Sequence, residues 1–141
     1  MSMSGLGAQY LYEEAEAHKR VGELLRKQRD LAAKCAIEEL AELNEQLVEA
    51  IGDAHAATER RHRALAEMGL DLASPLLRAA WVELRKALRM VRSEAALSQE
   101  VAAEMTADVQ FLLGLLQPAV EGYGRDGRRC GRGPALLDSA A

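Results

Sequence analysis

The chain has 141 residues, of which 49% are apolar, 28% are charged and only 4% are aromatic, and its formal net charge is -4. This length suits one domain with a modest core. A composition rich in Ala, Leu, Glu and Arg is typical of long helices and argues strongly against a β-rich fold. Nucleic-acid-binding proteins normally carry a basic face, so the negative charge predicts no nucleic-acid partner.

Two features of the sequence bear on its compartment. The N-terminal stretch MSMSGLGAQYLYEE lacks the apolar core of a signal peptide, and no later run approaches the ~18 apolar residues that a membrane span requires. The two cysteines, Cys35 and Cys130, lie far apart without metal-type spacing, which argues against a disulfide framework. We therefore expect a cytoplasmic protein with no membrane insertion.

The first predicted helical block runs from Tyr10 to Cys35, with apolar residues at helical spacing. Its apolar stripe slips at residues 33 to 37, because continuing the same phase would place three glutamates on it. One helix from residue 6 to 67 would be ~90 Å long, too long for a compact domain of this size. We therefore expect a turn near Lys34, with a continuous helix as the alternative because no Gly or Pro marks the turn. Cys35 is expected to be a small buried hydrophobic residue.

The second predicted block is a helix that ends at Gly69 and the loop LDLASP. Its predicted apolar stripe has the 4-3 spacing of a packed helix. The stripe consists of Ile37, Leu40, Asn44, Leu47, Ile51, Ala54, Thr58, Leu65 and Met68.

The third predicted block is one long helix from Pro75 to Leu116, about 63 Å in length. Ser74 suits the N-cap, proline is tolerated at the first helical position, and Pro118 predicts the stop. An unbroken 4-3 stripe follows this block, with Ser98 as its one polar member, and we expect Trp81 to be at least half-buried. The stripe comprises Leu77, Trp81, Leu84, Leu88, Val91, Ala95, Ser98, Ala102, Met105, Val109, Leu112 and Leu116.

These blocks predict an all-α protein, an elongated antiparallel bundle of three to four long helices over residues 1–118. The third helix is expected to pack antiparallel against the second. We expect residues 119–141 to form a separate, flexible tail rich in Gly and Arg, because such a composition cannot continue a helix.

Candidate catalytic and metal-binding chemistry is weak. His55, Glu59 and His62 lie on one helix at E-x-x-H spacing, but helical carboxylate metal sites need a second such motif on a facing helix, and the sequence has none. The basic run Arg60 to Arg63 is flanked by glutamates and is expected to be a solvated helix face. We expect no catalytic residue, no metal and no cofactor.

Surplus hydrophobicity on the third helix is the strongest functional signal. FLLGLL, residues 111–116, is apolar on nearly every side, and a helix of this kind must be covered by something. Two alternatives remain open at this point. The surplus is either ordinary core with a homodimer interface, or a docking surface for the amphipathic segment of a partner.

Several segments together resemble the FlgN family of flagellar export chaperones. They are LLRKQRDLAAKCAIEELAELNEQLVEAI at 24–51, ALAEMGL at 64–70, VQFLLGLL at 109–116, YGRDGR at 123–128, and LLD near the end. The resemblance covers nearly the whole chain. Its most specific parts are the short Gly-Leu loop after the second block and the Y-G-x-D-G-[RK] element.

The resemblance implies a non-enzymatic cytoplasmic chaperone. FlgN-type proteins bind the C-terminal segments of hook-filament junction (hook-associated) proteins and deliver them to the cytoplasmic domain of the export gate. The tail would then become ordered on a client or reach the gate, with Tyr123, Arg125 and Arg128 as docking residues. A self-associating coiled-coil scaffold or adaptor is the alternative function. The expected client-binding residues are Val101, Met105, Val109, Leu112, Leu113 and Leu116.

Overall fold

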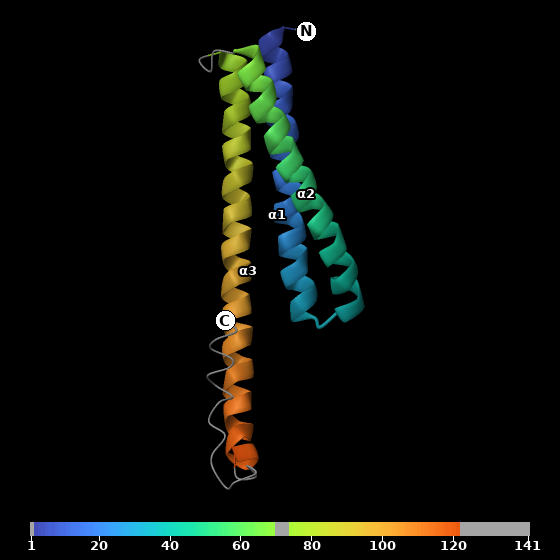
Figure 1. The fold of residues 1–141 in the computed structure, drawn as a ribbon, viewed down its shortest axis with the longest axis vertical. Helices are drawn as coiled ribbons and strands as arrows, with labels where there is room; N and C mark the ends of the chain where they lie inside the picture. Colours follow the sequence, from blue (N-terminus) through green and yellow to red (C-terminus); the bar gives the residue numbers. More distant parts are fainter. Residues whose placement is uncertain (1, 70–73, 122–141) are drawn as a thin grey trace. The chain divides into compact units, whose positions relative to one another are not determined.

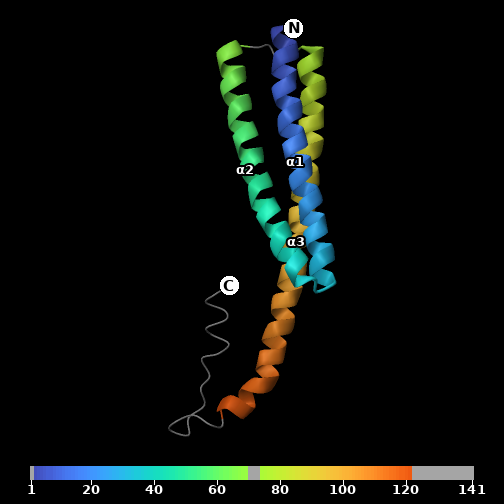
Figure 2. The same cartoon turned by 90° about the vertical axis from the view of Figure 1, so that its right-hand side faces the viewer.

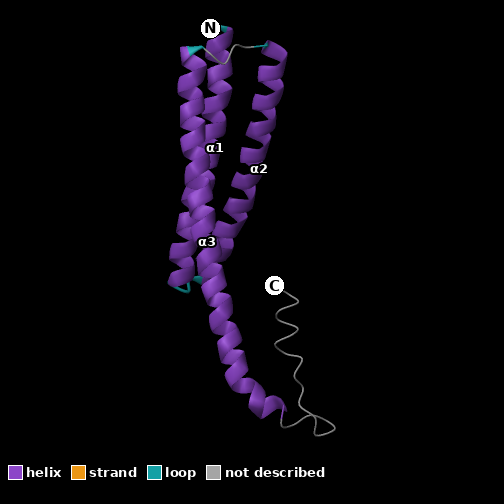
Figure 3. Cartoon of the chain, turned by 90° about the vertical axis from the view of Figure 1, so that its left-hand side faces the viewer, coloured by secondary structure: helices purple, strands orange, loops and turns teal. Residues whose placement is uncertain are grey.

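The protein is all-α, as the sequence predicts. The computed structural model describes residues 2–69 and 74–121, and in them three long helices follow one another: α1 (Met3–Ala33), α2 (Ile37–Met68) and α3 (Pro75–Glu121) (Figure 1). The described residues outside these helices are short turns and contain no strand (Figure 3). The chain divides into two compact units, Met1–Ser98 and Gln99–Ala141. Each unit is described by itself below.

Local sequence explains most of the helix ends. The side chain of Ser2 caps α1 by accepting a hydrogen bond from the amide of Gly5 at 3.1 Å. Gly69 ends α2 in the left-handed conformation, with φ of 58°, which glycine adopts without steric cost. At the start of α3, the carbonyl of Ser74 accepts the first helical hydrogen bond from Arg78, and Pro75 occupies the first helical position.

A tight turn separates α1 from α2, so the predicted break near Lys34 is confirmed and the continuous helix is wrong. Cys35 has a positive φ of 54°. Its amide donates to the carbonyl of Ala32, and the next amide, of Ala36, donates to Leu31, both at 3.1 Å. This pair of bonds is a Schellman motif, normally built around glycine. Cys35 is consequently exposed in the turn, and the expectation that it is buried was wrong.

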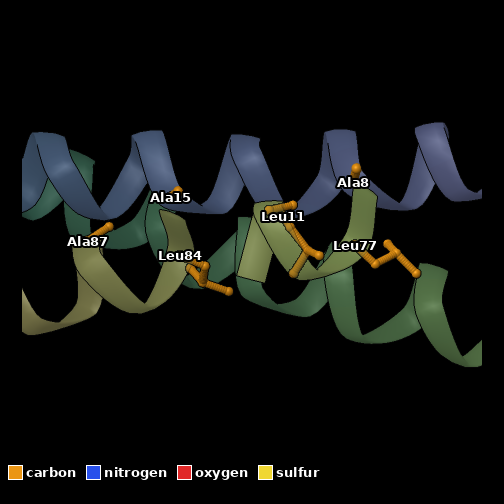
Figure 4. Close-up of a cluster of buried hydrophobic side chains, with 7 residues drawn as sticks. Ala8, Leu11, Ala15, Leu77, Leu84 and Ala87 are labelled. Atoms are coloured by element: carbon orange, nitrogen blue, oxygen red, sulfur yellow. The ribbon is translucent and has the colours of Figure 1, made fainter. Parts of the chain in front are cut away.

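The first unit contains α1, α2 and the part of α3 up to Ser98, and these helices run side by side with α2 antiparallel to both others (Figure 2). One core cluster joins α1 to α3 (Figure 4). Leu11, Leu77 and Leu84 are completely buried there. They lie among small residues that allow the two helices to approach closely, namely Ala8, Ala15, Ala80 and Ala87.

A second core cluster joins α1 to α2 and consists of Val21, Leu47, Ala50 and Ala54. The predicted stripe on α2 is therefore only partly correct, because its members Leu47 and Ala54 are buried here. Ile51, expected inside, is 50% exposed, whereas its neighbour Ala50 is 1% exposed. Small alanines of α2 permit close packing on α1 beside the buried Leu47, and Ile51 falls at the edge of the interface.

Helix α3 is continuous through Ser98, as predicted. Trp81 is partly buried and packs against the first core cluster, which confirms the expectation for the single tryptophan. Its neighbour Arg61 on α2 lies over the indole ring, 5.1 Å from the centroid. The helix runs to Glu121, so Pro118 does not stop it at once.

Candidate functional site

The second unit carries an exposed apolar surface on α3, in the region from which the sequence predicts client binding. Five of the six predicted residues are exposed: Met105 54%, Val109 52%, Leu112 57%, Leu113 39% and Leu116 62%. Val101, the sixth, is partly buried. Apart from the adjacent pair Leu112 and Leu113, they recur at intervals of three or four residues and therefore lie along one side of the helix. We call these six residues the apolar stripe.

Two further apolar side chains, missing from the predicted set, extend this exposed surface. Phe111 is 67% exposed and Leu115 is 63% exposed. They lie four residues apart and outside the phase of the apolar stripe. The signal for them was present in FLLGLL, whose apolar character continues around the helix.

Acidic residues border the apolar stripe. Glu104 and Asp108 lie four residues apart, and Asp108 precedes Leu112 by another four, so the carboxylates follow one edge of the stripe. Residues 99–116 also contain Glu100, but no Lys or Arg. This surface is therefore apolar with an acidic edge, which suits a partner that carries basic residues beside an apolar face.

The first unit contains a buried polar cluster around Glu14, whose side chain is 2% exposed. Arg61 binds the carboxylate with two hydrogen bonds, Nε to Oε2 at 2.7 Å and Nη2 to Oε1 at 3.1 Å. The hydroxyl of Thr58 donates to Oε1 at 2.8 Å, and Nε2 of His18 lies 3.6 Å from the same oxygen. Burial raises the pKa of Glu14, but the hydrogen bonds from Arg61 and Thr58 outweigh it, and the pKa lies below its ordinary value.

This cluster corrects the expectation of a solvated basic run at residues 60–63. Arg60, His62 and Arg63 are exposed, but the side chain of Arg61 is only 11% exposed. The residue lies on the face of α2 that packs in the bundle, and Glu14 neutralises its charge there.

A second buried carboxylate, Glu94 on α3, binds two arginines of α1. Arg26 donates to Oε1 at 2.8 Å, and Arg29 binds Oε2. Arg29 also donates to the backbone carbonyl of Glu94 at 2.8 Å and to the hydroxyl of Ser98 at 3.1 Å. Hydrogen bonds from Arg29 and Arg26 hold the pKa of Glu94 below its ordinary value. Ser98, the one polar residue in the predicted stripe of α3, is thus part of a structural ion-pair cluster.

The histidines singled out in the sequence form no constellation with metal-binding geometry. His55 and Glu59 are both largely exposed, with Nε2 and Oε1 3.6 Å apart, as expected of an i,i+4 pair. Residues 2–69 and 74–116 bring together no group of three or more His, Cys, Asp or Glu side chains that could hold a metal ion. In the described helices, no segment combines the length and the hydropathy needed to cross a bilayer.

The predicted docking residues Tyr123, Arg125 and Arg128 lie outside the described residues. The described residues form three long helices, and the second unit exposes an apolar helix surface. The family model of the FlgN protein matches residues 8–129, and the chain belongs to the FlgN family. The members of this family are flagellar export chaperones, which bind flagellar proteins, and the family is not an enzyme family. No curated protein and no solved structure matched the chain.

Proposed function

We propose that this protein is a cytoplasmic chaperone that binds the C-terminal segments of hook-associated proteins and delivers them to the export gate. The apolar stripe on α3 is the observation that carries the proposal. Its residues are exposed over several helical turns, and large exposed apolar patches on water-soluble proteins are commonly binding sites.

A disordered client terminus fits this surface by a simple physical route. An amphipathic segment folds against the stripe and removes apolar area from water at roughly 25 cal/mol per Å². Part of that gain is offset by the entropy lost when the segment becomes ordered. The resulting affinity is moderate, which permits release of the client before export.

The tail supplies the proposed contact with the export gate. Tyr123 lies between two glycines, and Arg125 and Arg128 follow closely. Tyrosine and arginine are frequent anchors at protein interfaces, because they combine a large contact area with directional hydrogen bonds. In this proposal capture of the client and docking at the gate use different segments of the chain.

Placing two charges in the stripe tests the capture step. Val101→Asp together with Leu113→Asp is expected to weaken binding of the C-terminal segment of a hook-associated protein by about 100-fold or more, since truncating well-packed interface contacts commonly costs ~1–3 kcal/mol each. Isothermal titration calorimetry with the purified segment measures the change.

The same helix offers a matched control. Ala103 and Ala107 are exposed and lie away from the stripe, so Ala103→Asp with Ala107→Asp adds the same two charges to α3. Client affinity should stay within about twofold of the original protein. Circular dichroism checks that both variants remain helical. If the stripe variant is folded and binds the segment normally, the client site lies elsewhere and the scaffold alternative gains support.

A further inference from the structure

An exposed row of arginines runs along α3 within the first unit. Arg78, Arg85 and Arg92 recur every seven residues, and Arg89 lies between the last two. Seven residues make about two helical turns, so these side chains share one side of the helix. The ion pairs between described residues include none of the four. We call these four residues the arginine row.

The carboxylates of this part of α3 are engaged elsewhere. Glu83 pairs with Lys86 at 3.2 Å, and the buried Glu94 binds two arginines of α1. Residues 75–98 contain no other Asp or Glu. The arginine row is therefore a local excess of positive charge on a chain whose formal net charge is -4.

Apolar surface lies beside the arginine row, on the side of α3 that contacts α2. Trp81 follows Arg78 by three residues and precedes Arg85 by four, and Arg61 of α2 lies over its ring. These two members of the row line a cavity of about 560 Å³ together with Trp81 and the exposed Val82. A ligand in this cavity would contact an indole ring between two guanidinium groups.

A second cavity, further along the same helix, is an apolar groove of about 430 Å³. Its wall includes Val91 and Ala95 of α3 and the half-exposed Ile51 of α2, and no carboxylate occurs among its described lining residues. Arg92 precedes Ala95 by three residues and follows Leu88 by four, so it borders this groove. Both cavities thus combine an apolar wall with a basic edge.

We propose that the arginine row docks an acidic amphipathic helix of another protein. Guanidinium groups bind carboxylates through paired hydrogen bonds, and all four members of the row are Arg rather than Lys. Arg78, Arg85 and Arg92 follow one another at about 10.5 Å along the helix, so a helix alongside with an acidic residue at every seventh position meets all three. Its apolar side chains enter the two cavities. The apolar stripe takes no part, so the inference does not rest on the proposed function.

The surroundings of the row favour a protein helix over a nucleic acid. Nucleic acids bind mainly through their phosphates, which gain nothing from the apolar walls beside the arginines. The wall formed by α2 also carries His55 paired with the exposed Glu59, whose carboxylate would repel a phosphate backbone. An acidic amphipathic helix matches both the charge and the apolar character of this surface.

A designed peptide tests the docking on the full chain. It is an alanine-based helix of about 20 residues, with leucines on one face, glutamates at every seventh position beside them, and no tryptophan. Trp81 is the only tryptophan and lines the first cavity, so its fluorescence reports binding. We expect a dissociation constant of about 100 µM or lower at low salt, and a constant at least about tenfold higher when glutamine replaces glutamate in the peptide. No binding at about 1 mM, or equal binding of both peptides, overturns the inference.

Charge reversal locates the site. Arg85→Glu with Arg92→Glu should weaken binding of the glutamate peptide at least about tenfold, measured by calorimetry, and should create binding of a lysine version of the peptide. Arg60→Glu with Arg63→Glu is the matched control, since both arginines are exposed on α2 and neither lines the two cavities. Affinity for the glutamate peptide should stay within about twofold in this control. Circular dichroism checks that both variants are helical. Equal effects of the two variants would show unspecific charge attraction and overturn the inference.

Two further probes separate the other possible occupants. Val101→Asp with Leu113→Asp leaves the arginine row intact and should bind the glutamate peptide as the original protein does. Loss of binding in that variant would assign the peptide to the apolar stripe and overturn the inference. A labelled single-stranded oligonucleotide should bind the original protein no more tightly than it binds Arg85→Glu with Arg92→Glu. Oligonucleotide binding that depends on these arginines and exceeds that of the peptide would make the partner a nucleic acid, and the inference would be wrong.

Discussion

Glu14 shows how one residue links all three helices of the first unit. Its buried carboxylate on α1 binds Arg61 of α2, and Arg61 in turn lies over Trp81 of α3. A buried charge is tolerated only where hydrogen bonds and an opposite charge compensate its lost hydration. The cluster therefore fixes which faces of the helices meet, in addition to any net stabilisation that it provides.

Glu14→Gln is expected to lower the free energy of unfolding at pH 7 by about 1–3 kcal/mol, because it leaves Arg61 without its charged partner. The pKa of Glu14 is lowered in the folded protein, so its contribution is complete above the ordinary value of 4.5 and disappears as the pH falls through the folded-state pKa. The difference between variant and original protein should therefore shrink below about pH 4.5. Urea unfolding at a series of pH values measures it.

Glu16→Gln is the control for Glu14→Gln. Glu16 is exposed on α1 and pairs with Lys19 at 3.1 Å. Exposed ion pairs contribute little, so this change should cost at most about 0.5 kcal/mol at neutral pH. A pH-independent difference for Glu14→Gln would show that the carboxylate charge is not what stabilises the cluster.

At the scale of elements, the turn between α1 and α2 depends on hydrogen bonding rather than on a typical turn residue. Cys35 occupies the position after the helix cap that most Schellman motifs give to glycine. A left-handed conformation costs a residue with a Cβ roughly 1–2 kcal/mol, which glycine avoids. The turn therefore forms in spite of its sequence, because the two long helices it connects pack against each other.

Cys35→Gly should consequently stabilise the protein. We expect an increase of about 0.5–1 kcal/mol in the free energy of unfolding, after the greater entropy of glycine in the unfolded chain is included. Lys34→Gly is the matched control and should destabilise, because Lys34 has right-handed helical angles. Urea unfolding of both variants measures the effects. Destabilisation by Cys35→Gly would show that the left-handed conformation of Cys35 does not strain the turn.

At the scale of the whole molecule, the protein combines a self-sufficient bundle with surfaces for other chains. Alanines and leucines fill the core of the first unit. Its ion-pair clusters hold α1 against α2 and against α3. The second unit exposes apolar residues that its own described part does not cover. This division suits a chaperone, whose stability must not depend on its client.

Tyr123→Ala tests whether capture and delivery are separable functions of the chain. We expect melting temperature and client affinity to remain nearly unchanged, because Tyr123 lies between two glycines after Pro118 in the sequence, where no local residue would bury its ring. Secretion of the hook-associated client should fall, since the proposed contact with the gate loses its aromatic anchor. Tyr123→Phe, which keeps the ring, should retain most secretion. A loss of several degrees in melting temperature would instead make Tyr123 structural.

Much of this protein could be predicted from its sequence because helix formation is largely local. Spacing and capping residues predicted the second and third helices, and Gly69 and Pro75 mark ends that the structure shares. The surplus of apolar residues at 101–116 indicated that this part of the helix needs a cover, and five of the six residues named from it are exposed. The resemblance to FlgN chaperones followed from the order of such segments, and the family match confirms it.

The tertiary structure alone decided which side of each helix is covered. Ala50 and Ile51 are equally compatible with the apolar pattern of α2, but close packing on α1 selects the smaller residue. The burial of Arg61 likewise depends on Glu14, which lies far away in the sequence, and the conformation of Cys35 depends on the packing of the helices it joins. Periodicity predicts a helix from neighbouring residues, whereas the partner of each face is set by contacts between distant ones.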